Sequence, residues 1–267
     1  MQKNWQEQIA SFDDRMHTQK NFDIIKRRLE IDGHTAYLYM INGFAKDDIL
    51  EKVTRFILLH KGEHIQPGIT PEEFLARYVT YTEASVSQDF DYISRRLLTG
   101  SVVLFVDLFM PAILLDAWAY PSRGIEEPDD EKVLRGAHDG FSEILVNNTA
   151  LIRRRIRSED LIMEMHTVGS RSKTFVVLAY LNEKVDRDFL QRLQHKLDNL
   201  QVNSLTMAQE SLNEALVEKG WYNPFPKVRY TERPDAAAAR YGGDRRKRYG
   251  NLRSHFVLQA RRVGADT

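Results

Sequence analysis

The sequence predicts an α/β fold of two small subdomains, in which strands are interleaved with amphipathic helices. Apolar runs with strand spacing occur in pairs, one within residues 22–41 and another within residues 161–181. Helical patterns with one apolar face flank both pairs. A third helical pattern, at residues 128–157, bridges them. A mixed α+β arrangement is also compatible with this order of elements.

The first subdomain is expected at residues 20–125, after a helix within residues 1–19. Residues 3–16 place Trp5, Ile9 and Phe12 on one face of that helix. Asp32-Gly33 separates two apolar runs and predicts a hairpin. The other elements predicted here are helices at 46–61, from Thr70-Pro71 onward and at 89–98 before Gly100, and strands at 79–86, 102–107 and 112–119.

The second part is expected at residues 126–239 and begins with the bridging helical stretch. Pro128 and the carboxylates after it favour a helix start, because acids offset the exposed N–H dipoles of a first turn. Gly136 and Gly140 predict a bend. The remaining predicted elements are strands at 161–168 and 174–181 and helices at 186–200 and 206–219.

Composition excludes several classes of protein. The chain has 267 residues, 38 basic and 38 acidic side chains and no cysteine, so disulfides and thiolate chemistry are excluded. Balanced charge gives no overall attraction to nucleic acid, and none is expected as a partner. The N-terminus lacks the apolar core of a signal peptide. The most apolar stretch, residues 101–118, is interrupted by Asp107, Pro111 and Asp116, so no membrane span is expected in it.

The histidines and glycines do not form a recognisable active site. His138 and Asp139 are adjacent and would point in different directions on a helix. His60 and His64 have the spacing of metal ligands, but Gly62 lies between them and no third ligand is near in sequence. Residues 169–173 lack the spacing of a phosphate loop and favour a hairpin turn. We therefore expect no enzymatic activity, no metal and no cofactor.

Arginines are concentrated at the end of the bridging helical stretch, at Arg153, Arg154, Arg155 and Arg157. Basic residues complement the dipole at a helix C-terminus, which accounts for part of this cluster. The surplus has two interpretations. It pairs with the acids upstream, or it serves as an anion-binding or interface surface. The acids are Glu126, Glu127, Asp129 and Asp130.

Three segments carry a resemblance to a known family. They read RGIEEPDDEKVLRGAHDGFSEILVNNTALIRRRIR, MHTVGSRSKTFVVLAYL and NPFPKVRYTERPD. In this order they resemble the GerA family of spore germination proteins, over roughly residues 112–239. The resemblance implies the cytosolic N-terminal region of a protein of the spore inner membrane, acting in assembly and signal transmission for ion release. The implied partners are other germination membrane proteins or further copies of the chain, with membrane attachment through a C-terminal part that this chain lacks.

Two sets of candidate functional residues follow. A salt-bridge network between subunits or domains is expected from Arg123, Glu127, Arg135, Arg153, Arg154, Arg155, Glu232 and Arg233. Arginine–carboxylate pairs removed from water are costly to break singly, which suits a two-state switch. A hinge is expected at Thr231, Pro234 and Asp235, which in the family would precede the membrane portion. A purely structural helix cap accounts equally well for those three residues.

The resemblance ends in the last segment, residues 240–267, which is basic and nearly without pattern. One interpretation is a disordered basic tail. Another is a shifted reading frame, because codons permitted for residues 247–251 also spell an apolar run in the neighbouring frame. A different function also remains open: a soluble module that senses a small molecule in a cleft between the subdomains.

Overall fold

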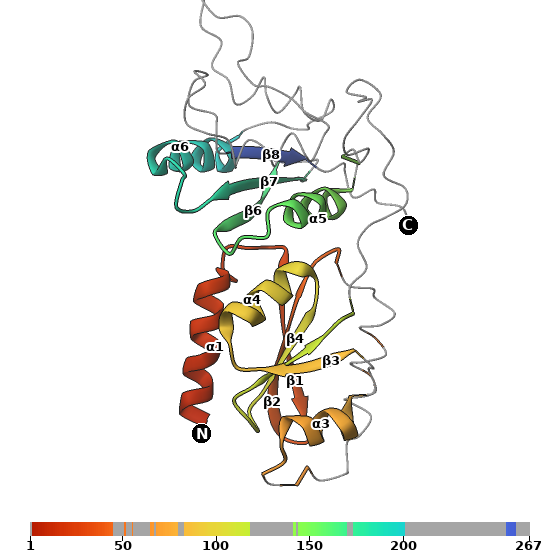
Figure 1. The fold of residues 1–267 in the computed structure, drawn as a ribbon. Helices are drawn as coiled ribbons and strands as arrows, with labels where there is room; N and C mark the ends of the chain where they lie inside the picture. The colour runs from red at the N-terminus through yellow and green to blue at the C-terminus, as the bar shows by residue number, and fades with distance from the viewer. Residues whose placement is uncertain are drawn as a thin grey trace, which may run out of the picture. The chain divides into compact units, whose positions relative to one another are not determined.

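The structure is a computed structural model that describes residues 2–44, 51, 55, 65–66, 68–79, 83–117, 141–142, 144–169, 173–200 and 255–259. The chain divides into two compact units (Figure 1). Unit 1 comprises Met1–Ser122 with Arg157–Glu159, and unit 2 comprises Arg123–Ile156 with Asp160–Thr267. Each unit is described by itself.

Unit 1 is built on a five-stranded sheet of order β1-β2-β4-β5-β3, in which every pairing is antiparallel. Asp32 and Gly33 both have positive φ, and they turn the chain from β1 into β2 as the hairpin signal predicts. The elements of unit 1 are α1 (Gln2–Met16), β1 (Ile24–Ile31), β2 (His34–Ile41), α3 (Pro71–Tyr78), β3 (Ala84–Ser87), α4 (Phe90–Thr99), β4 (Val102–Val106) and β5 (Ala112–Leu115).

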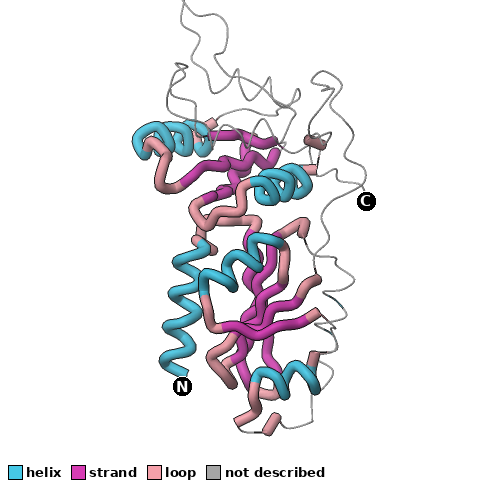
Figure 2. The backbone as a smooth tube through the Cα atoms, viewed as in Figure 1, coloured by secondary structure: helices cyan, strands magenta, loops and turns pink. Residues whose placement is uncertain are grey.

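Helices cover both faces of this sheet, so its central strand β4 is buried throughout (Figure 2). On one face, Phe12 of α1 contacts Tyr39, Phe105 and Phe90 at ring-centroid distances of 5.1–5.5 Å. On the other face, Phe74 of α3 packs into a core of aliphatic side chains from β1, β2, β4 and β5. The two faces follow from the alternation of side chains along each strand.

Capping residues set the ends of α3 and α4. Thr70 and Glu73 form a reciprocal capping box at the start of α3. Asp89 accepts a hydrogen bond from the amide of Asp91 at the start of α4, and Gly100 ends that helix with a left-handed φ of 114°. These ends were predicted from the sequence, and the structure confirms them.

Unit 2 contains a three-stranded antiparallel sheet of order β6-β7-β8. Leu190 and Leu197 of α6 pack against Ile162 and Leu178 of the sheet. The helix α5 contacts β8. The elements are α5 (Leu145–Arg155), β6 (Leu161–Val168), β7 (Thr174–Leu181), α6 (Arg187–Asp198) and β8 (His255–Gln259).

The predicted fold class is therefore confirmed, with antiparallel sheets in both units. Some predicted ends differ. The strand expected at 79–86 begins at Ala84, because its partner β5 ends at Leu115 opposite that residue. Of the helical stretch expected at 128–157, α5 covers Leu145–Arg155, and residues 128–140 lie outside the described residues. Within the segment 240–267, His255–Gln259 form β8 on the edge of β7, and both interpretations of that segment stay predictions.

Candidate functional site

Three consecutive arginines at the end of α5 have three different environments. Arg153 is completely buried and donates a hydrogen bond from Nη1 to the carbonyl of Leu161, over 3.1 Å. Arg154 is exposed. Arg155 is half-buried and donates back to the carbonyl of Leu151 in its own helix, over 3.3 Å. Each of the three makes further interactions, so none of these guanidinium groups is free. The cluster therefore contains one core residue, one surface residue and one residue that satisfies its own helix end.

The rest of the predicted network lies outside the described residues. This holds for the network residues Arg123, Glu127, Arg135, Glu232 and Arg233, for the hinge residues Thr231, Pro234 and Asp235, and for the acids Glu126, Asp129 and Asp130. The salt-bridge network and the hinge both stay predictions.

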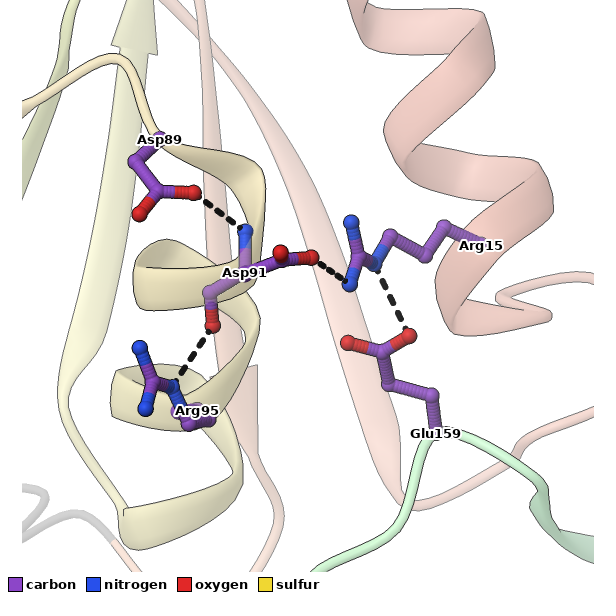
Figure 3. Close-up of polar contacts among 5 residues, drawn as sticks. All are labelled: Arg15, Asp89, Asp91, Arg95 and Glu159. Atoms are coloured by element: carbon purple, nitrogen blue, oxygen red, sulfur yellow. Dashed lines mark hydrogen bonds and ion pairs between the residues drawn. The ribbon is translucent and has the colours of Figure 1, made fainter.

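Sequence reasoning missed an ion-pair cluster in unit 1, which we call the Arg15 cluster: Arg15, Asp91 and Glu159 (Figure 3). Arg15 lies in the last turn of α1, and its Nε donates to Glu159 Oε2 over 2.8 Å. Its Nη2 pairs with Asp91 Oδ1 in the first turn of α4. The hydrogen bonds from Arg15 to Glu159 and then to Asp91 raise the pKa of the guanidinium. These partners are 144 and 76 residues away from Arg15, so no local pattern could have indicated them.

Asp13 of α1 makes three side-chain contacts, two of which join that helix to the sheet. It accepts hydrogen bonds from Thr18 and Tyr39 and pairs with Lys26. Burial, followed by the proximity of Asp13, raises the pKa of the Tyr39 phenol. The ammonium group of Lys26 also lies 4.2 Å from the ring centroid of Tyr37. These contacts fix α1 on β1 and β2.

A pocket of about 440 Å³ lies beside these contacts, between α1 and the sheet of unit 1. Trp5 of α1 stacks on Tyr37 of β2 at its wall, with ring centroids 5.7 Å apart. Asp107, another lining residue, is bound by His34 and by the amide of Thr35. The residues that line the pocket are Trp5, Gln6, Ile9, Ala10, Asp13, Arg28, Thr35, Tyr37 and Asp107.

Unit 2 has a polar group between β6, β7 and α6. Glu164 accepts hydrogen bonds from Tyr180 of β7 and from Gln194 of α6. Burial and then the bond to Glu164 raise the pKa of the Tyr180 phenol. His166 Nδ1 lies 3.1 Å from Asp198 Oδ1. These side chains fix α6 on the sheet.

The described part of the chain has no metal-ligand cluster and no membrane-spanning helix. Within it, no group of three or more histidine, aspartate and glutamate side chains is placed to hold a metal ion. His60, His64 and His138 lie outside the described residues. No helix in the described ranges is both long enough and apolar enough to span a membrane.

Comparison with known proteins gives relatives that are named for sporulation and for spore germination. The chain is 36% identical to stage V sporulation protein AF of Bacillus subtilis over 227 residues, covering 85% of this chain and 46% of that protein. It is 26% identical to spore germination protein KA of the same organism over 220 residues, covering 81% and 40%. The chain thus spans less than half the length of these relatives.

A solved structure has the same fold. The N-terminal domain of the A subunit of the Bacillus megaterium spore germinant receptor GerK3 matches with a TM-score of 0.61, at 20% identity, over 87% of this chain and 85% of that one. Residues 12–241 also match the sequence model of the family described as Bacillus/Clostridium GerA spore germination protein. This chain therefore belongs to the GerA family of spore germination proteins.

Proposed function

We propose that this chain is the cytosolic N-terminal region of a spore germination membrane protein and acts in assembly and signal transmission for ion release. The observation that carries the proposal is the shared fold with the N-terminal domain of a germinant receptor A subunit, nearly end to end in both chains. The relatives are about twice as long, and the proposal assigns the membrane portion to the part of them outside the matched region.

Arg154 is the described residue best suited to meet a partner. It is exposed at the end of a helix whose other face is buried, and its neighbours Arg153 and Arg155 satisfy carbonyls of unit 2. Charged residues at the rim of an interface steer partners and set which ones bind. The proposed partners are other germination membrane proteins or further copies of the chain.

Co-purification tests the assembly part of the proposal. Residues 12–241 of this chain would replace the matched region of stage V sporulation protein AF in Bacillus subtilis, and spore membranes would be solubilised in mild detergent. We expect the chimera to retain the membrane-protein partners of its parent. A chimera that inserts at the parent's level but purifies without those partners would contradict the proposal.

A small-molecule sensor is the second candidate function, and the pocket of about 440 Å³ in unit 1 is the observation in its favour. Its size is in the range of ligand sites. The test is thermal unfolding of the chain with single amino acids and sugars, since a ligand that binds only the folded state raises the Tm with concentration. A rise that Tyr37→Ala abolishes would favour this function, and no rise with any compound would remove it.

A further inference from the structure

Arg157–Glu159 has an exceptional position in the chain. The helix before it and the strand after it belong to unit 2, whereas these three residues belong to unit 1. The backbone therefore passes between the units after Ser122, after Ile156 and after Glu159. Without the association of Arg157–Glu159 with unit 1, only the passage after Ser122 would remain.

The Arg15 cluster ties this segment to two rigid elements of unit 1 (Figure 3). Arg15 follows Phe12 and precedes Met16, both completely buried, so the end of α1 is fixed in the core. Asp91 lies in a first helical turn that Asp89 caps, and Arg95 donates to the carbonyl of Asp91 over 3.1 Å. Glu159 is joined to these elements through the 2.8 Å bond from Arg15.

The exposure of these groups suits an interaction that opens and closes. The side chains of Arg15 and Glu159 are 29% and 31% exposed, so water and salt reach the pair. Charge-assisted hydrogen bonds are stronger than neutral ones, but partly exposed pairs are weakened by solvent and by salt. Such a pair holds a segment in place, but the free energy needed to release the segment stays small.

We propose that the Arg15 cluster is a conformational latch within unit 1, which keeps Arg157–Glu159 on α1 and α4 of that unit and opens to release the segment. The proposal concerns this chain alone and does not depend on the proposed role in germination. Release of the bond to Glu159 frees the connection between α5 and β6. Opening of this kind involves a local segment and leaves the cores of both units folded.

Limited digestion of the 267-residue chain with trypsin tests the latch, because the exposed Arg157 is itself a cleavage site within the segment. Cleavage between Arg157 and Ser158 is followed by mass spectrometry relative to cleavage after Arg192 on α6. When opening is fast, the cleavage rate follows the population of the open form. We expect Arg15→Gln and Glu159→Ala each to raise the relative rate about fivefold.

Matched variants separate the latch from general destabilisation. Arg95→Gln removes a hydrogen bond within α4, to the carbonyl of Asp91, but no bond to Glu159, and it should leave the relative rate unchanged. The double variant Arg15→Gln/Glu159→Ala should equal either single variant, because both remove one interaction. Unchanged relative cleavage in the single variants, a parallel rise after Arg192, or multiplicative effects in the double variant would each overturn the proposal.

Discussion

Arg153 contributes to the core of unit 2, although its sequence context suggests a surface cluster. Its side chain is completely buried, and its guanidinium supplies a donor to the Leu161 carbonyl at the start of β6. Arg154, one residue later, is exposed because successive residues on a helix point about 100° apart. The three consecutive arginines thus have different roles, and the packing of α5 determines which role each one has.

Substitution of Arg153 should lower the stability of the fold much more than substitution of Arg154. Arg153→Ala removes a buried donor and the packing of its aliphatic stem, so the free energy of unfolding should fall by about 2–4 kcal/mol. Arg154→Ala should change it by less than about 1 kcal/mol. Urea unfolding followed by circular dichroism measures both. Equal losses of unfolding free energy in the two variants would mean that the buried Arg153 stabilises the fold no more than the exposed Arg154 does.

Asp116 should make the stability of unit 1 depend on pH in the acid range. Burial opposes its ionisation, but hydrogen bonds from Arg96 and from Ser101, the latter over 2.7 Å, outweigh burial and lower the pKa of the carboxyl. A lowered pKa in the folded state gives stability that is present above the ordinary value of 3.8 and is lost as the pH falls through the lowered value. Asp116→Asn should therefore reduce the Tm at pH 7. In acid, the difference in Tm between this variant and the wild type should become smaller. A Tm difference independent of pH would contradict this assignment.

At the scale of elements, the start of α5 depends on a buried asparagine. Asn148 accepts from the amide of Ser142 over 2.8 Å and donates to its carbonyl over 2.6 Å, so it pairs with that residue as a neighbouring strand would. Ile144, whose backbone is extended, lies directly before the helix Leu145–Arg155. The part of the predicted helical stretch at residues 128–140 lies outside the described residues.

Asn148→Ala should leave both backbone groups of Ser142 without this partner. We expect a loss of about 1–3 kcal/mol in the free energy of unfolding, because each is a buried or partly buried polar group. Asn147→Ala, at a half-buried neighbouring position of the same helix, is the matched control. Similar effects of the two substitutions would argue against the specific role of Asn148.

We expect partners to bind at the exposed end of α5 in a way that depends on the charge of Arg154. Arg154→Glu should weaken co-purification of membrane partners at least severalfold, whereas Arg192→Glu on the exposed face of α6 should not. Arg192 is a better control than Arg187, because Arg187 donates to Asn182 and lies in a first helical turn, where glutamate is favourable. Loss of partners in both variants would indicate a general effect of charge.

Most elements could be predicted where local signals set them. The bounds of β6 and β7 agree with the sequence residue by residue, because both strands are strongly apolar and end at turns. Elements that end where a distant partner ends could not be predicted. The strand β5 stops at Leu115, opposite Ala84 and Val102, which are the first residues of β3 and β4. The side chain of Asp116 then accepts a hydrogen bond from Ser101. The Arg15 cluster depends on such long-range contacts throughout.

At the scale of the whole molecule, the family relationship determines the functional account more than any single site does. The two units have separate cores, and the chain passes through unit 1 again at Arg157–Glu159. The proposed role in signal transmission therefore rests on the family relationship and on the fold shared with a germinant receptor domain.

The most direct test of the central claim is the release of potassium from germinating spores of Bacillus subtilis. Spores lacking stage V sporulation protein AF would carry the chimera in which residues 12–241 of this chain replace the matched region. We expect potassium release from the chimera to be faster than in the deletion strain and close to the parent, and to be slower when the chimera carries Arg154→Glu. Release no faster than in the deletion strain, from a chimera present at the parent's level, would contradict it.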